Sequence, residues 1–261
     1  MSVLALGLPR RATHVFERNV MAYRHQWLIF ISGFAEPVLY LLGIGFGIGS
    51  LVPNISTAGG HSVSYAMFVA PALLAWSAMN GAIIETTFNF FFKVRYAKTF
   101  DAVIATPLEV EDAVLGEVMW AVARGSIYSV AFVVLMLALG LIASPWALLA
   151  IPAAVLIGFA FAALGSAVTS FMRTWQDFDM VNLALQPMFL FSATFFPITV
   201  YPAVLQAVVK LTPLYHAVNL IRGLTTGVVG VEQVGNVAYL VGMAIVGLAI
   251  AAFRLRRQLL K

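Results

Sequence analysis

One acidic residue stands inside a long apolar stretch of the sequence. Glu36 lies roughly ten residues into the run that begins near Trp27, and Pro37 follows it directly. A carboxylate in such a run is costly, so by default it marks a functional position. Proline also removes a backbone donor and kinks a helix. Two interpretations stay open: Glu36 faces a translocation path or a partner helix, or it only hydrogen-bonds near the kink, in its protonated form.

The other reactive side chains form no recognisable catalytic or metal-binding motif. The sequence has no cysteine, and its four histidines are scattered, at positions 14, 25, 61 and 216. It contains no GxxxxGK[ST], HExxH or GxSxG pattern, so neither a P-loop nor those hydrolytic sites are expected. Asp177 and Asp179 fit a helix cap better than a metal site. The chain is therefore expected to be no enzyme and to bind no cofactor or metal of its own.

The composition explains why the sequence has so few reactive side chains. Hydrophobic residues make up 62% and charged residues 10% of the chain, whereas soluble domains have about 45–50% and 25%. Charge-free runs at 37–84, 125–172, 180–209 and 233–253 each exceed the ~20 residues that cross a bilayer core. The runs are continuous rather than alternating, which excludes a β-barrel. The modest net charge of +4 is interpreted through membrane topology, and no nucleic-acid binding is expected.

These runs predict an all-α integral membrane protein with six transmembrane helices. The expected spans cover 27–49, 66–88, 119–142, 146–171, 179–199 and 234–253. Residues 1–26 are expected to form a separate first element, and residues 27–261 the six-span transmembrane domain.

The first 26 residues have the pattern of an amphipathic helix. Ala12, Phe16, Val20, Tyr23 and Trp27 fall within roughly 80° of arc at about 100° per residue, and charged residues occupy the rest. Such a helix lies in the membrane interface. The alternative is a short basic tail that only supplies charge for orientation.

Basic residues also indicate which side each loop faces. All of the 15 Lys and Arg residues except Lys210 and Arg222 fall on one side of the six-span arrangement. Because basic residues accumulate in cytoplasmic loops, both termini are expected in the cytoplasm of a multi-pass cell-membrane protein.

Prolines divide the segment between the fifth and sixth expected spans. Pro197 ends a span, Pro202 opens the apolar stretch 203–211, and Pro213 stops it. At ~1.5 Å per residue this stretch is under half a bilayer, and the following stretch, with Arg222, is equally short. Together they predict a re-entrant helical hairpin that dips in from the outer face and acts as a gate. Arg222 must either extend to the lipid headgroups or meet an acceptor such as a carbonyl end of the hairpin, and a gate would hold it in the second arrangement. An ordinary extracellular loop with surface helices is the alternative.

Two sets of residues carry a family likeness. The run 98–108 (KTFDAVIATPL) with Leu115-Gly116-Glu117 resembles the loop after the second span in type-2 ATP-binding-cassette (ABC) exporter permeases. The sequence also resembles the C-terminal signature of that family, at 187–197 (PMFLFSATFFP), 212–220 (TPLYHAVNL) and Arg222-Gly223. The likeness covers nearly the whole chain and is nearest to the nodulation-factor-exporter-like branch. It implies a dimer of permeases on two separate ATP-binding subunits, which would hold the ATP and Mg²⁺. A homodimer is expected, and a heterodimer is the alternative.

The 93–117 loop is the expected contact with such a motor. It is the longest cytoplasmic connection and has a mixed-charge surface. Thr106 and Pro107 resemble a helix start, with Thr106 as the cap and Pro107 in the first turn. The expected coupling residues are Lys98, Asp101, Thr106, Pro107, Leu108 and Glu109. The alternative is a solvated connector capped for its own sake.

The sequence thus favours an exporter permease that moves an amphipathic substrate, either a drug, a lipid or a lipid-linked glycan, out of the cytoplasm. The rival class is a secondary transporter that works without ATP. Such a protein would be expected to show paired repeats with charged or broken helices, and the two halves show no corresponding repeat. A membrane enzyme ranks third, because its motifs are missing.

Overall fold

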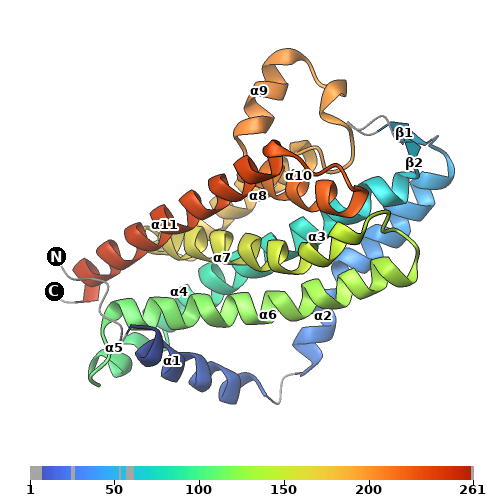
Figure 1. Cartoon of the computed structure of the whole chain (residues 1–261). Coiled ribbons are helices and arrows are strands. Elements are labelled where there is room, and N and C mark those ends of the chain that lie inside the picture. The colour runs from blue at the N-terminus through green and yellow to red at the C-terminus, as the bar shows by residue number, and fades with distance from the viewer. Residues whose placement is uncertain (1–7, 25–26, 53, 57–61, 260–261) are drawn as a thin grey trace.

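The computed structural model describes residues 8–24, 27–52, 54–56 and 62–259. This part of the chain is helical, apart from a two-stranded antiparallel hairpin of β1 (Ile55–Ser56) and β2 (Ser62–Val63). Long helices lie side by side in one bundle, with α9 projecting at one end (Figure 1). The α-helices are α1 (Leu8–Tyr23), α2 (Trp27–Tyr40), α3 (Tyr65–Ile84), α4 (Phe90–Arg95), α5 (Thr99–Ile104), α6 (Val110–Ala138), α7 (Ala150–Thr169), α8 (Asp177–Phe191), α9 (Ala203–Leu211), α10 (Pro213–Thr226) and α11 (Val231–Leu259).

Short turns of other helix types extend several of these helices. The π-helix η1 (Leu41–Gly47) and the 3₁₀ turn η2 (Ile48–Ser50) continue α2, and the π-helix η3 (Glu85–Asn89) joins α3 to α4. The 3₁₀ turns η4 (Pro145–Leu149) and η5 (Ile198–Val200) precede α7 and α9. Short 3₁₀ turns are common at helix ends, and π-helical turns occur mostly within longer helices.

Four helices of the described part are long and apolar enough to cross a membrane: Tyr65–Arg95, Val110–Ala138, Pro145–Thr169 and Val231–Gln258. They correspond to the second, third, fourth and sixth expected spans. The second runs to Arg95 rather than to 88, because η3 continues the helix without a break. The first and fifth expected spans fall on the shorter α2–η2 segment and on α8. The fifth ends at Phe191 rather than at 199, since Ala193 turns left-handed with φ 57°.

α3 is the central helix of the bundle. Most of its residues are buried, and it packs against α6, α7 and α10. A helix that is apolar all round belongs in such an interior position. α11 lies closely along α7, since a Cβ on Gly247 would come within 2.7 Å of the Ala163 carbonyl carbon. Small residues of this kind allow helix backbones to approach each other in membranes.

A second, smaller hydrophobic core joins the elements at one end of the bundle. Val15 of α1, Phe90 of α4, Phe100 of α5 and Leu255 of α11 are all buried in it. The N-terminal helix and the last turns of α11 therefore lie at the same end. We call it the basal end, and the end with the β-hairpin and α9 the distal end (Figure 1).

α1 is part of the bundle, and it packs along α6. Its most buried residues are Ala12, Val15 and Asn19, while Val20, which the sequence placed on the apolar face, is 41% exposed. The contact face is rotated because α1 rests on Gly116, where an added Cβ would lie 2.5 Å from the Val15 Cβ. Whether α1 also lies in the membrane interface stays a prediction.

Candidate functional site

Arg222 of α10 is held at the distal end by backbone carbonyls. Its Nη2 donates to Ala193 O at 2.8 Å and to Thr194 O at 3.4 Å, and its Nε donates to Phe68 O at 3.2 Å. The guanidinium also lies 3.8 Å from the centre of the Phe68 ring. Ala193 and Thr194 lie just beyond the C-terminal end of α8, and Phe68 lies in the first turn of α3. Arg222 therefore meets backbone acceptors, but these lie outside the expected hairpin and not at one of its carbonyl ends. Its role as a gate stays a prediction.

The three prolines expected to shape this region stand at element boundaries. Pro197 precedes η5, Pro202 precedes α9, and Pro213 opens α10. Proline suits these positions because its fixed φ matches a helix start and its missing N–H would be unpaired there. α9 and α10 meet at 88°, which fits a broken span or a re-entrant loop. Lys210 of α9 is exposed.

The 93–117 loop, at the basal end, differs from the expected structure at Thr106. Thr106 does not cap a helix, because its N–H and its Oγ1 both donate backwards to Val103 O. α6 begins at Val110 instead, and the N–H of Glu109 donates to Asp112 Oδ2 at 3.0 Å, one half of a capping box. The expectation of a cap at Thr106 with Pro107 in the first turn is therefore wrong.

The expected coupling residues form an exposed surface on this loop. Lys98, Thr106, Pro107 and Glu109 are exposed, and Leu108 is half-buried. Lys98 adopts φ 47° directly before α5. The Asp101 side chain lies outside the described residues. The arrangement offers a mixed-charge face, and whether a motor binds there stays a prediction.

Glu36 lies on the exposed side of α2. It lines a cavity of about 80 Å³ together with polar groups of two other helices, among them Asn80 of α3 and Arg124 and Tyr128 of α6. A space of this size holds only a few water molecules. Glu36 thus borders a small polar cavity and not a wide channel within one copy of the chain.

The structure contains buried ion pairs that were not predicted from the sequence. Glu117 of α6, whose side chain is 3% exposed, contacts Lys93 Nζ at 2.6 Å and Arg18 Nη2 at 2.8 Å. Glu85 contacts Arg124 Nη1 at 2.6 Å, again with both side chains buried. Glu85 falls inside an expected span, so the rule applied to Glu36 would also have marked it.

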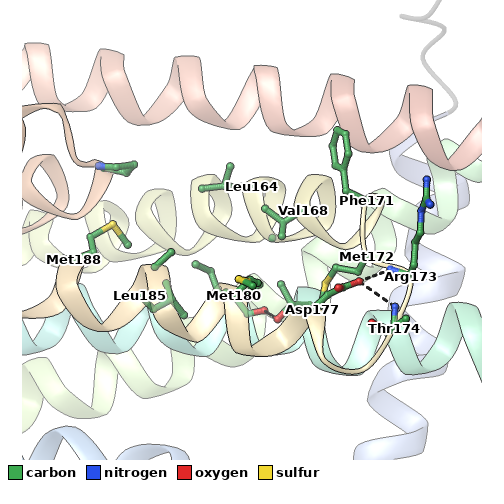
Figure 2. Close-up of a pocket in the computed structure, with 16 residues that line it drawn as sticks. Leu164, Val168, Phe171, Met172, Arg173, Thr174, Asp177, Met180, Leu185 and Met188 are labelled. Atoms are coloured by element: carbon green, nitrogen blue, oxygen red, sulfur yellow. Dashed lines mark hydrogen bonds between the residues drawn. The ribbon is translucent and has the colours of Figure 1, made fainter.

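A cavity of about 740 Å³ lies between α7 and α8. Figure 2 shows Leu164 and Val168 of α7 opposite Met180 and Leu185 of α8, with Met188 at one end. The polar residues Arg173, Thr174 and Asp177 lie at the other, basal end. We call this space the α7–α8 cavity. Cavities of this volume accommodate drug-sized ligands.

Comparison with known proteins gives consistent matches over most of the chain. The family model described as ABC-2 type transporter matches residues 11–225. Nodulation protein J of Rhizobium leguminosarum bv. trifolii is 33% identical over 95% of this chain and 93% of the relative, and that of Rhizobium meliloti (strain 1021) is 31% identical over 94% and 93%. The inner membrane transport permease YadH of Escherichia coli (strain K12) is 25% identical over 79% of each chain. The chain therefore belongs to the ABC-2 type transporter family, as a non-catalytic transmembrane permease.

Proposed function

We propose that this permease exports an amphipathic molecule from the cytoplasm and is powered by a separate ATP-binding subunit. The observation that carries the proposal is an ABC-2 transporter chain without a P-loop. A transporter of this type needs a motor, and the sequence has no such site of its own. ATP and Mg²⁺ would bind to the partner. The apolar α7–α8 cavity supports a substrate that is largely hydrocarbon.

The proposed topology has six spans with both termini in the cytoplasm. The α2–η2 segment covers residues 27–50, a length close to the ~20 residues that cross a bilayer. α8 would complete the count together with the residues that follow it. The shared basal location of α1 and the end of α11 supports an even number of crossings. Lys93, Arg95 and Lys98 lie on the loop at that end, as the cytoplasmic side requires.

We place the motor contact on the 93–117 loop. The exposed loop residues border a depression of about 340 Å³ between α1 and α5, lined by His14, Arg18, Thr99 and Thr106 among others. α1 is tied to α6 and α4 through Glu117. A movement of the loop would therefore be transmitted to α1, α4 and α6 together. Two permease copies with two motor subunits would form the transporter, and the path would run between the copies.

Purification of the membrane complex tests the proposal. The full chain should bring down a P-loop ATPase in equal amount, and ATP hydrolysis should rise when both are reconstituted together. Reversing the charge of Asp101 together with Thr106→Pro should uncouple hydrolysis from transport while the complex still assembles. Transport at the normal level in this variant would contradict the coupling contact. Transport without any ATPase would indicate a secondary transporter instead.

A further inference from the structure

The α7–α8 cavity has a polar end and an apolar body. Its body is lined by aliphatic and methionine side chains, and Pro213 of α10 lies at the distal end with Met188. Thr87 is the one hydroxyl along the described body, and its Oγ1 donates to Ile83 O of its own helix at 2.6 Å. It therefore adds no free donor to the cavity. The lining matches a hydrocarbon chain along most of its length.

Cations lie at and near the basal mouth of the cavity. Arg173 lines the mouth and is exposed. Arg95 Nη2 donates to the carbonyl of the lining residue Met172 at 3.3 Å, and the Arg254 guanidinium lies 3.7 Å from the ring centre of the lining residue Phe171. Three guanidinium groups thus stand at or beside one short turn.

The single carboxylate at this mouth is already engaged. Asp177 Oδ2 accepts the backbone N–H of Arg173 at 2.6 Å and that of Thr174 at 3.0 Å (Figure 2). The N–H of Thr174, with that of Arg173, lowers the pKa of Asp177 below its usual value. Asp177 thus holds the turn that precedes α8, and the mouth keeps an excess of positive charge.

We propose that the α7–α8 cavity binds the alkyl chain of the exported amphiphile, with an anionic head group at Arg173. The inference rests on the proposed function and deepens it, because it names a site inside one permease copy and the charge of the head. The chain would enter from the basal side and extend toward Pro213. The path between two copies would then receive a molecule already oriented along α8.

The cavity, of about 740 Å³, is apolar along its body and has cations beside its mouth, which matches an alkyl chain with an anionic head. A hydrocarbon chain gains little from leaving equally apolar lipid. Selectivity must therefore come from the charged mouth, which is why the occupant needs an anionic head.

The same helix links this cavity to the Arg222 contacts. Met180, Ala184 and Met188 of α8 line the cavity, and the carbonyls just beyond α8 hold Arg222. Within α8, only Leu185 and Phe189 are buried. A weakly packed helix can shift when an alkyl chain fills the space beside it. Binding of an alkyl chain in the cavity would thereby alter the Arg222 contacts at the distal end.

Photolabelling of the purified full chain tests the site. The probe is a long-chain fatty acid that carries a diazirine near its methyl end, added to vesicles of neutral phosphatidylcholine that contain the permease. Label should concentrate on the lining residues of α7 and α8 and should be displaced by unlabelled fatty acid. Equal label along the exposed face of α11 would overturn the proposal, since it would indicate simple contact with lipid.

Matched variants separate the body from the mouth. Ala184→Trp should obstruct the cavity and reduce labelling severalfold, whereas Ala249→Trp, the same change on an exposed position of α11, should not. Ala184→Leu gives a milder second variant with an intermediate loss. Arg173→Ala should raise the half-saturating probe concentration about twofold to fivefold, the range of one exposed ion pair. Arg257→Ala is its control.

A neutral probe and ATP complete the test. The corresponding fatty alcohol should be insensitive to Arg173→Ala, and an equal effect on both probes would refute the anionic head. In the complex with the ATP-binding subunit, ATP should lower the label in the cavity, because the bound alkyl chain leaves the cavity during export. Label that ignores ATP would identify a resident lipid and contradict the proposal. If no ATPase binds, the proposed function fails, while the labelling still decides the site.

Discussion

Removal of the Glu117 carboxylate should detach α1 from the bundle. Glu117 is the acceptor that Lys93 and Arg18 share, and its side chain is 3% exposed. Glu117→Ala would leave two cations facing each other without a counter-charge. Lys93 is the more buried of the two, with a side chain 14% exposed against 33% for Arg18, so most of the cost arises there.

The expected cost is about 3–5 kcal/mol in the free energy of unfolding, the range for breaking a buried ion pair by deleting one partner. Another acidic residue of α6 supplies the control. Glu111 contacts Arg256 at 3.6 Å, and the Arg256 side chain is 64% exposed. Glu111→Ala should therefore cost less than about 1 kcal/mol. Replacing both of the more buried partners, by Lys93→Met with Glu117→Leu, should restore part of the loss, because the charge left without a partner is then that of Arg18, which is 33% exposed.

Two measurements follow this change. Denaturant unfolding in detergent micelles, followed by tryptophan fluorescence, would compare the variants, since Trp120 of α6 stacks on Tyr23 at 5.2 Å. Labelling with a maleimide would report on α1 itself. Ala12 is fully buried against α6, so Ala12→Cys should react slowly in the parent chain and quickly once Glu117 is removed. Equal costs for Glu117→Ala and Glu111→Ala, with Ala12→Cys still protected, would refute this reasoning.

Two further predictions concern the distal end and the topology. Arg222→Leu should impair export while expression and motor binding persist, because it removes charged hydrogen bonds worth about 1.5–3 kcal/mol. Lys210→Leu, at an exposed position, should reduce export much less. Equal, negligible losses of export in both variants would favour a surface loop. A cysteine at Ser62 should react with an impermeant maleimide from outside, and one at Ala97 only after the membrane is opened. The reverse labelling pattern would overturn the proposed orientation.

Much of the helical framework was predictable because hydropathy and proline act locally. Four of the expected spans fall on helices long enough to cross a membrane, and the boundaries at Pro202 and Pro213 are where the sequence placed them. The error at Thr106 arose because a turn that folds back on Val103 has the same residue types as a cap. Which of the two forms depends on the neighbouring elements.

The contacts between distant segments could not be predicted. Lys93, Arg18 and Glu117 come from three elements, and no spacing in the sequence relates them. The buried face of α1 depends on Gly116 of α6, so Val20 turned outward although the helical periodicity placed it inward. Tertiary packing, and not amphipathicity alone, selects such a face. For Arg222 the sequence left headgroups or a protein acceptor open, and the carbonyls that hold it come from segments outside the expected hairpin.

The central claim is that this permease moves an amphipathic molecule with energy from a separate ATPase. Vesicles that contain the chain and its co-purified ATP-binding subunit test it most directly. A fluorescent long-chain fatty acid should move across the membrane when ATP is supplied on the side of Ala97, and should stop moving when the P-loop lysine of the partner is replaced. Movement that continues unchanged in that mutant complex would contradict the account.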